Sequence, residues 1–527
     1  MILLIIKKNN LKYNETEIIN MKKTTPIIGI IAVLGISYIG IAWHTGNVIE
    51  KEIDNTIDRV TEQINNSQNV FNVQITHSND EKHIFSTQTH INITLLPKDE
   101  IINDKLPLID TDFTIYHGPF PIAALKQGIF SPQMAWIEYP IAEPKFDLVE
   151  VIGARPLITG NMSISYNGDV TLSWLTNGFK VKQNRETHFL SDLEAELGAS
   201  SLTFTSKSDQ STPSIKLDLD KYHHQFASEY LTLNNLHFNL TGEKQSNHVN
   251  LALTFDKLRT NQKNKFFNNI YDFDEYDLDT FILDNLISKV TIDPANQDVD
   301  TQISLGNFTL IPQSSILQPA IQLEGLSINQ KVNLNDARVL SGSFTSSVNS
   351  IFLGKQNLGN AMIDIDYQDL DKAIFGEEFV DVETHYNQPI ESKVKLKNFN
   401  WHNLSGDINI KGSLDITNLD QISEANNPLD SIDNLTLHVN VPLNVLVRIL
   451  AQSWDADHND VADEQIELWE DETQEMLEHL FGDLPLFKLS KGEEQGLFMD
   501  IEIFKDSNEA NINGQIYNKN DILEMLE

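Results

Sequence analysis

The chain has 527 residues, of which 40% are hydrophobic and 22% are charged, a balance typical of folded globular proteins. Its 76 acidic residues outnumber the 38 basic ones and give a formal net charge of -38, which disfavours binding to nucleic acid. The sequence contains no cysteine, which excludes disulfides, thiolate metal sites and cysteine nucleophiles.

An uncharged apolar segment near the N-terminus predicts a membrane anchor. Residues 25–43 read TPIIGIIAVLGISYIGIAW, which as a helix is long enough to cross a hydrocarbon core about 30 Å thick. Lys22 and Lys23 precede the segment and acidic residues follow it. We therefore expect residues 1–24 to stay in the cytoplasm and the C-terminal body to be exported.

Two features of this N-terminal region leave alternatives open. The segment could be a cleaved signal peptide, but its length and the position of Trp43 favour an uncleaved anchor. Translation could start at Met1 or at Met21, because Met21, Lys22 and Lys23 form a better start for such an anchor than residues 1–20. After the anchor, apolar residues at helical spacing predict a membrane-proximal helix within residues 44–66.

From residue 67 to residue 440 the hydrophobic pattern has a period of two, interrupted by Gly, Asn, Asp and Pro turns. The stretches 231–240 and 406–416 are examples of half-buried strands, whereas residues 192–197 are expected to form a short helix or turn. Residues 441–484 predict a helical pair, and residues 485–527 predict strands with a short terminal helix. The expected fold is α+β and predominantly antiparallel β.

The predicted sheet has an apolar face that must be hidden. Few amphipathic helices are available to cover it, so the sheet is expected to curl, to stack on another sheet or to leave a groove. A curled sheet with an unfilled apolar face could hold a lipid tail, whereas a filled sandwich could not. The sequence does not decide between these arrangements.

The segment His117, Gly118, Pro119, Phe120 and Pro121 is the candidate binding site. The two prolines restrict the backbone and predict a rigid turn between a strand and a helical turn at residues 122–126. A structural corner that joins these elements is the alternative to a binding edge, and the sequence favours the corner. No nucleophile lies nearby in sequence, so His117 is not assigned a catalytic role.

Other motifs predict no metal, cofactor or catalytic residue. Residues 455–460 carry calcium-type oxygen ligands at three positions but lack the glycine and glutamate of such a loop. We interpret them as a solvated loop between two helices. His223 and His224 are expected at the surface. No zinc-protease, nucleophile-elbow or phosphate-loop motif is present in the sequence.

Two motifs give the chain a family resemblance. GIAWHTGNVIE at residues 40–50 and IYHGPFPIAALKQG at residues 115–128 resemble the YdgA-like family of bacterial envelope proteins, a domain of unknown function. The resemblance extends over nearly the whole chain from Met21. It implies a single-pass anchor in the bacterial inner membrane and a periplasmic body, and it implies no activity.

Three functions remain open at this stage. The first is a non-enzymatic envelope factor that binds another envelope protein, or a second copy of itself, or assists assembly. The second is a lipid-binding or lipid-transfer module that shelters acyl chains on a curled sheet. The third is a periplasmic hydrolase that uses carboxylates which no spacing singles out. The first is preferred, and the protein is accordingly expected not to be an enzyme.

Overall fold

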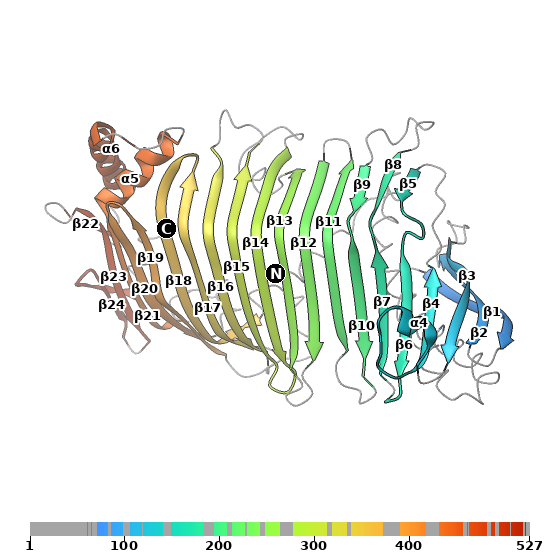
Figure 1. The fold of residues 1–527 in the computed structure, drawn as a ribbon. Coiled ribbons are helices and arrows are strands. Elements are labelled where there is room, and N and C mark those ends of the chain that lie inside the picture. The colour runs from blue at the N-terminus through green and yellow to red at the C-terminus, as the bar shows by residue number, and fades with distance from the viewer. Residues whose placement is uncertain are drawn as a thin grey trace. The chain divides into compact units, whose positions relative to one another are not determined.

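The fold is known from a computed structural model (Figure 1). The structure describes residues 61, 65 and 71–522, except for residues 83–85, 98–105, 118–119, 141–148, 168, 184–193, 208–212, 227–228, 243–247, 264–277, 313–318, 335–338, 373–389, 418–431, 457–460, 462, 482–485, 491–494, 506 and 520–521. The predicted anchor lies outside these residues, and of the predicted membrane-proximal helix only Thr61 and Asn65 are described, both helical. Within the described ranges, no helix combines the length and the apolar character needed to cross a bilayer.

The chain forms two compact units. The first comprises Met1–Phe179 with Ala199–Ser214, and the second comprises Lys180–Gly198 with Ile215–Glu527. Both are built mainly from antiparallel strands, so the predicted large antiparallel sheet with few helices is confirmed.

The first unit is a short antiparallel sheet with one helical turn. Its elements are β1 (Phe71–Lys82), β2 (Ser86–Pro97), β3 (Leu106–His117), α4 (Ile122–Lys126), β4 (Gln133–Pro140), β5 (Val149–Gly153), β6 (Thr159–Ser165), β7 (Val170–Thr176) and β10 (Ser200–Ser206). The strands pair in the order β1, β2, β3, β4, β6, β7 and β10.

One face of this sheet is fully buried. Along β6, buried residues alternate with more exposed ones, as expected for a strand with one face in a core. Ile93, Phe113, Ile137 and Leu172, which come from four strands, each have an exposed fraction of 3% or less. The first unit therefore has a packed hydrophobic core of the ordinary kind.

The second unit is a long meander in which each strand pairs with its neighbour in sequence. Its strands are β9 (Glu194–Leu197), β11 (Ser214–Phe226), β12 (Glu229–Gly242), β13 (Val249–Lys263), β14 (Leu278–Asp293), β15 (Asp298–Ile311), β16 (Ile321–Asn333), β17 (Val339–Leu353), β18 (Gln356–Asp371), β19 (Glu391–Asn403), β20 (Gly406–Thr417), β21 (Ile432–Pro442), β22 (Lys488–Ser490), β23 (Gly496–Phe504), β24 (Glu509–Ile512) and β25 (Gln515–Asn518). β9 precedes β11, and β23 follows β21 in the pairing order. β8 (Phe179–Gln183) begins at the last residue of the first unit.

Two helices complete the second unit. α5 (Leu443–Trp454) follows β21 directly and packs on β18, β20, β21 and β23, while α6 (Asp463–Phe481) packs on α5. Leu443, Val447 and Leu477 form the buried contact between the two helices. Gly354 has no room for a side chain, because a Cβ there would lie 2.3 Å from the carbonyl oxygen of Ala456. The end of α5 is thereby held closely against the turn before β18.

The expected helix or turn at residues 192–197 is wrong. Its described part, Glu194–Leu197, is strand β9, which pairs with β11. Glu194 and Glu196 are two residues apart and therefore lie on the same side of the strand. The Glu194 carboxylate is 3.6 Å from Lys182 Nζ, and the Glu196 carboxylate is 3.4 Å from Lys180 Nζ. Partners distant in sequence therefore override a local pattern that is too short to be decisive.

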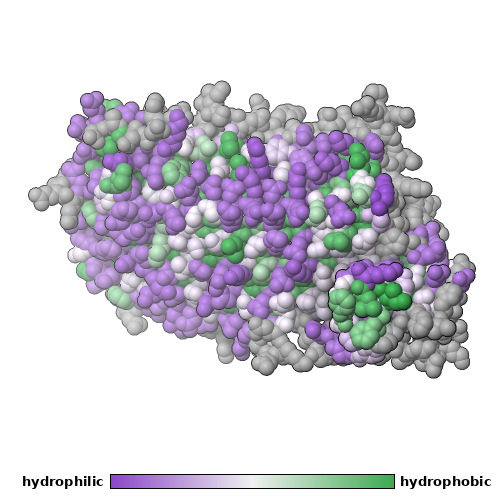
Figure 2. Space-filling view, viewed as in Figure 1, coloured by the Kyte–Doolittle hydropathy of each residue, from purple (hydrophilic) through white to green (hydrophobic). Residues whose placement is uncertain are grey.

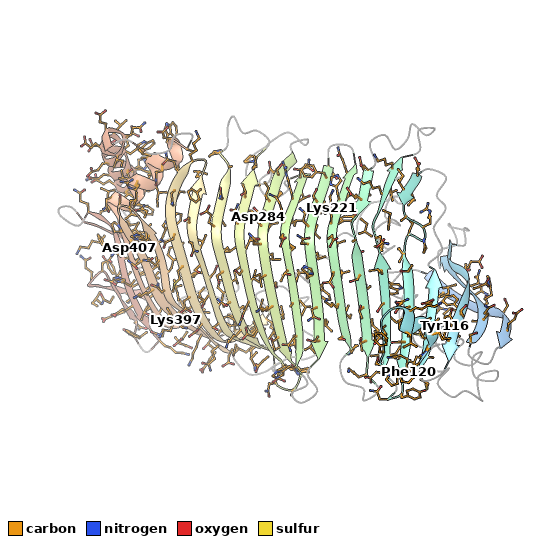
Figure 3. The ribbon with its side chains drawn as sticks, viewed as in Figure 1. Tyr116, Phe120, Lys221, Asp284, Lys397 and Asp407 are labelled. Atoms are coloured by element: carbon orange, nitrogen blue, oxygen red, sulfur yellow. The ribbon has the colours of Figure 1, made fainter. Side chains whose placement is uncertain are left out.

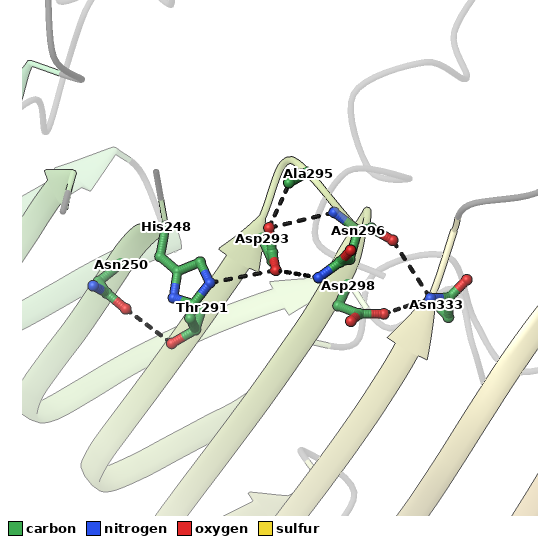
Figure 4. Close-up of polar contacts among 8 residues, drawn as sticks. All are labelled: His248, Asn250, Thr291, Asp293, Ala295, Asn296, Asp298 and Asn333. Carbon is green, nitrogen blue, oxygen red and sulfur yellow. Dashed lines mark hydrogen bonds and ion pairs between the residues drawn. The ribbon is translucent and has the colours of Figure 1, made fainter. Parts of the chain in front are cut away.

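A network of polar side chains closes the turn between β14 and β15 (Figure 4). The Asp293 carboxylate accepts hydrogen bonds from the backbone N–H of Ala295 at 2.9 Å and from the side chain of Asn296 at 2.8 Å. His248 lies 3.4 Å from the same carboxylate. The bond from Ala295 is the largest cause that lowers the pKa of Asp293 below its ordinary value.

The Asp293 turn gives a testable pH dependence. A lowered pKa in the folded state means that the ionised carboxylate stabilises the turn above the unfolded pKa of about 3.9 and that this effect is lost as pH falls through the folded pKa. Asp293→Ala should therefore speed hydrogen exchange of the β14–β15 turn at pH 6 and have little effect once the wild-type carboxylate is protonated. Asp300→Ala, which removes an exposed ion pair with Lys331, is the control and should have little effect at either pH. Equal effects of Asp293→Ala at both pH values would contradict this assignment.

Candidate functional site

The strands of the second unit carry a continuous apolar face. Residues that are paired across antiparallel strands project from the same side of a sheet, so the register assigns side chains to transverse rows. One such row consists of Leu217, Phe238, Leu253, Ser288, Ile303, Ile328, Ser346, Ile363, Phe399, Ile410, Val439 and Met499. All but its two serines are apolar.

Two further rows have the same character. A second row consists of Leu240, Leu251, Val290, Thr301, Gln330, Phe344, Ile365, Leu396, Gly412, Leu437 and Ile501. A third consists of Leu233, Leu258, Leu283, Phe308, Leu323 and Ile351. We call the surface formed by these three rows the apolar face. Because strands lie about 4.8 Å apart, the first row is roughly 50 Å long.

The apolar face is only half covered. Along β16 and β17 no residue is fully buried, and the apolar side chains of both strands are intermediate in exposure. The first unit differs, because its inward apolar side chains on β6 and β7 are fully buried. Leucine and isoleucine side chains on the second sheet thus keep part of their surface in water, at a cost of about 25 cal/mol per Å².

A line of polar residues crosses the sheet at one height, and we call it the midline. In each of seven strands, two consecutive polar or glycine residues interrupt the alternation. The pairs are 220–221, 234–235, 256–257, 284–285, 306–307, 324–325 and 349–350, in β11 to β17. The register places them opposite one another from strand to strand.

The midline has an unusual backbone. Asn235, Asn285 and Gly325, on alternate strands, have left-handed φ values of 51°, 56° and 64°. Residues of this conformation inside strands are typical of bulges, which bend the strand. Since all seven strands carry the doubled residues at the same height and the left-handed residues alternate between strands, the register is unbroken across this line.

The apolar face continues across the midline. Apolar residues on both sides of it are separated by two polar residues rather than one, and this doubling keeps them on a common face. Leu219, Phe255 and Leu305 adjoin the midline on alternate strands and are buried, with exposed fractions of 9%, 9% and 4%. Most other side chains of the face are more exposed.

The opposite face is polar and carries ion pairs. Lys257 lies 3.5 Å from Asp284, and Lys397 lies 2.8 Å from Asp366 (Figure 3). Asp366 is the largest cause that raises the pKa of Lys397. Exposed pairs of this kind contribute little stability. Their charged groups make this side of the sheet a poor surface for an apolar ligand.

One end of the apolar face contains two polar aromatic residues. Tyr222 and His224 lie on β11 with ring centroids 5.6 Å apart. Burial raises the pKa of Tyr222, and burial is also the largest cause that lowers the pKa of His224. His223 and His224, which were expected at the surface, are both half-buried. A histidine with a lowered pKa stays neutral at physiological pH, so it does not place a charge on this face.

The predicted site at residues 117–121 forms a corner in the first unit. His117 ends β3 and pairs with Ala135 of β4, whereas Gly118 and Pro119 lie outside the described residues. Pro121 is buried and accepts a hydrogen bond from the backbone N–H of Leu125 at 3.1 Å. Phe120 is 51% exposed (Figure 3). The segment thus joins a strand to α4 and leaves one aromatic ring in water.

The loop at residues 455–460 is described only at its first two positions. The backbone oxygens of Asp455 and Ala456 accept hydrogen bonds from Gln356 and Lys355, which ties the loop to the start of β18. Over the described parts of the chain, no group of three or more histidine or acidic residues is placed to hold a metal ion. The remaining loop residues, 457–460, lie outside the described ranges.

Comparison with known proteins identifies the family. The model of a family described as bacterial protein of unknown function (DUF945) matches residues 21–377. The chain belongs to this family. Protein YdgA of Escherichia coli (strain K12) is 24% identical over 388 residues, which cover 70% of this chain and 63% of that relative's own length. No solved structure matches the chain. The resemblance seen in the motifs at residues 40–50 and 115–128 is thereby confirmed at the level of the family.

The contrast between the two sheets can be measured with a matched pair of substitutions. Ile93→Ala, in the packed core of the first unit, should cost about 2–5 kcal/mol because it leaves a cavity. Ile328→Ala, on the half-exposed apolar face, should cost about 1 kcal/mol because its neighbours are already partly hydrated. Hydrogen exchange of peptides from β2 and β16 reports each unit separately. Equal costs would show that the apolar face is covered as well as the core is.

Proposed function

We propose that this protein is a non-enzymatic, membrane-tethered envelope protein whose apolar face binds the acyl chains of lipids. The observation that carries the proposal is the continuous, half-buried apolar face across twelve strands of the second unit. Soluble proteins seldom leave so extended an apolar surface in contact with water unless it binds something.

The shape of the apolar face suits acyl chains better than a folded protein partner. A row roughly 50 Å long exceeds the length of one acyl chain, and the first and second rows, two residues apart along each strand, lie about 7 Å from each other. The side chains are mainly Leu, Ile, Val and Phe, with isolated hydroxyl and amide groups such as Thr301 and Gln330. A chain of methylene groups needs no polar partner, so a face without convergent polar groups can bind it.

The energetics favour occupation of this face. Each methylene group removed from water contributes about 0.8 kcal/mol, so even partial burial of a long chain yields several kcal/mol. Occupation would also cover the leucine and isoleucine surface that the sheet leaves exposed.

The predicted anchor supports a membrane lipid as the ligand. Residues 44–70 connect the predicted anchor to β1, and with residues 44–66 helical, as predicted, this connection spans about 50 Å. The folded units can therefore stay close to the bilayer from which a phospholipid would come. On this proposal the two units are periplasmic, and the protein is anchored in the bacterial inner membrane.

The topology can be tested with reporter fusions. Alkaline phosphatase fused after Glu527 should be active, because the C-terminal body is exported and this reporter requires an oxidising compartment. A fusion after Lys23 should be inactive and serves as the control. Activity of the second fusion but not of the first would overturn the membrane topology.

Lipid binding can be tested with adjacent substitutions on opposite faces. Ile328→Lys places a charge on the apolar face, whereas Asn329→Lys places the same charge on the polar face of the same strand. Full-length protein is incubated with vesicles that contain a phospholipid with a photoactivatable acyl chain. Crosslinked peptides are then mapped by mass spectrometry.

The expected result is crosslinking to peptides of β12 to β19 in the wild type and in Asn329→Lys, with a several-fold loss in Ile328→Lys. Crosslinks confined to the predicted anchor would count against the proposal. So would equal labelling of the two variants, because the charge on the apolar face should exclude the methylene chain.

A further inference from the structure

We propose that an exposed apolar patch around α4 in the first unit inserts into the surface of the bilayer. The patch consists of Phe120, Ile122 and Phe130, whose exposed fractions are 51%, 62% and 74%. Figure 2 shows hydrophobic side chains gathered over α4, where most of the surrounding described surface is hydrophilic. We call these three residues the α4 patch. The inference rests on the membrane tether but not on the binding of lipids to the apolar face.

The helix that carries Ile122 of the α4 patch packs closely on β4. Ala123 and Ala124 are buried against Trp136, and Pro121 is buried at the start of α4. Trp136 Nε1 donates a hydrogen bond to Glu138 at 3.2 Å, and Gln127 Nε2 donates to the same carboxylate at 2.9 Å. The small residues of α4 therefore face the sheet, which directs its large apolar residue Ile122 outward.

The turn after α4 is equally well defined. Gly128 has φ +80°, and the backbone N–H of Ile129 donates to the carbonyl oxygen of Ala124 at 3.0 Å. Ile129 packs against the Ala123, Ala124 and Trp136 cluster, while the adjacent Phe130 is exposed. Since α4 and this turn are held by hydrogen bonds and packing, the exposed rings are a fixed feature of the surface.

Local charge favours a bilayer as the occupant. Residues 113–137 contain no acidic residue and a single lysine, Lys126, whereas the whole chain has 76 acidic residues in 527. Anionic headgroups repel most of this protein. Beside this patch they meet the Glu138 carboxylate, which accepts hydrogen bonds from Trp136 and Gln127, and they attract Lys126. Aromatic and aliphatic side chains next to a lysine match the composition of membrane-surface contacts.

The tether lowers the affinity that the patch requires. β1, the first strand of the first unit, begins directly after residues 44–70, the 27 residues that follow the predicted anchor. A unit held this close to the bilayer meets it at a high effective concentration, so three apolar side chains suffice for a stable contact. The contact would orient the first unit on the membrane.

Because the sequence contains no cysteine, a single introduced cysteine can be labelled specifically. Single cysteines replace Ile122 and Phe130, one at a time, and are spin-labelled in the full-length protein reconstituted into vesicles of phosphatidylethanolamine and phosphatidylglycerol. Leu175→Cys is the matched control, because Leu175 is an apolar residue of the same unit that is 53% exposed and lies at the opposite end of β6 and β7 from the Gln133–Ser165 pair that follows the α4 turn. The measurement is the accessibility of each label to oxygen, which concentrates in lipid, and to a nickel chelate, which stays in water.

The expected result is a ratio of oxygen to nickel accessibility several-fold higher at residues 122 and 130 than at residue 175. Low accessibility to both reagents would show that a protein surface or a second copy covers the patch, and would overturn the proposal. Water-like values at all three positions in protein that floats with the vesicles would overturn the patch alone. Protein that fails to float would overturn the tether and the inference with it.

Discussion

The register of the antiparallel strands is the constraint on which the second unit depends. Hydrogen bonds between neighbouring strands bring Phe238, Leu253 and Ile303 into one transverse row, although no two of them are close in sequence. A shift of one residue in any strand would move its apolar side chains to the polar face. The same register aligns the lysine and aspartate residues on the other side. Backbone pairing therefore creates both surfaces at once, and the apolar one is the proposed site of lipid binding.

The midline crosses this two-sided sheet without exchanging its two faces. Doubled polar residues on seven strands would break the alternation of any single strand, but their alignment keeps the breaks in phase. Buried residues such as Phe255 and Leu305 adjoin the line, whereas residues farther away remain half-exposed. The first unit shows the usual alternative, in which a sheet hides its apolar side chains in a dry core. The two units thus solve the same problem of apolar surface in different ways.

Much of this arrangement could be predicted from the sequence. Alternation within residues 231–240 and 406–416 correctly indicated strands, because period two is a local property. The doubled residues Asn234 and Asn235 were visible in the first of these, yet the midline emerges only when seven strands are aligned. The prolines of residues 117–121 indicated a corner, whereas the exposure of Phe120 depends on the packing of α4 on β4. Burial and register are properties of distant segments, which a single sequence does not bring together.

The meander has a modular consequence. Because β12 to β20 each contact mainly the strands before and after them in sequence, a hairpin could be added or removed without rewiring the rest of the sheet. Each such event would lengthen or shorten the sheet by two strand spacings, or about 10 Å. The length of the apolar face could thus change during evolution in steps of one hairpin, while the composition of each row stayed the same.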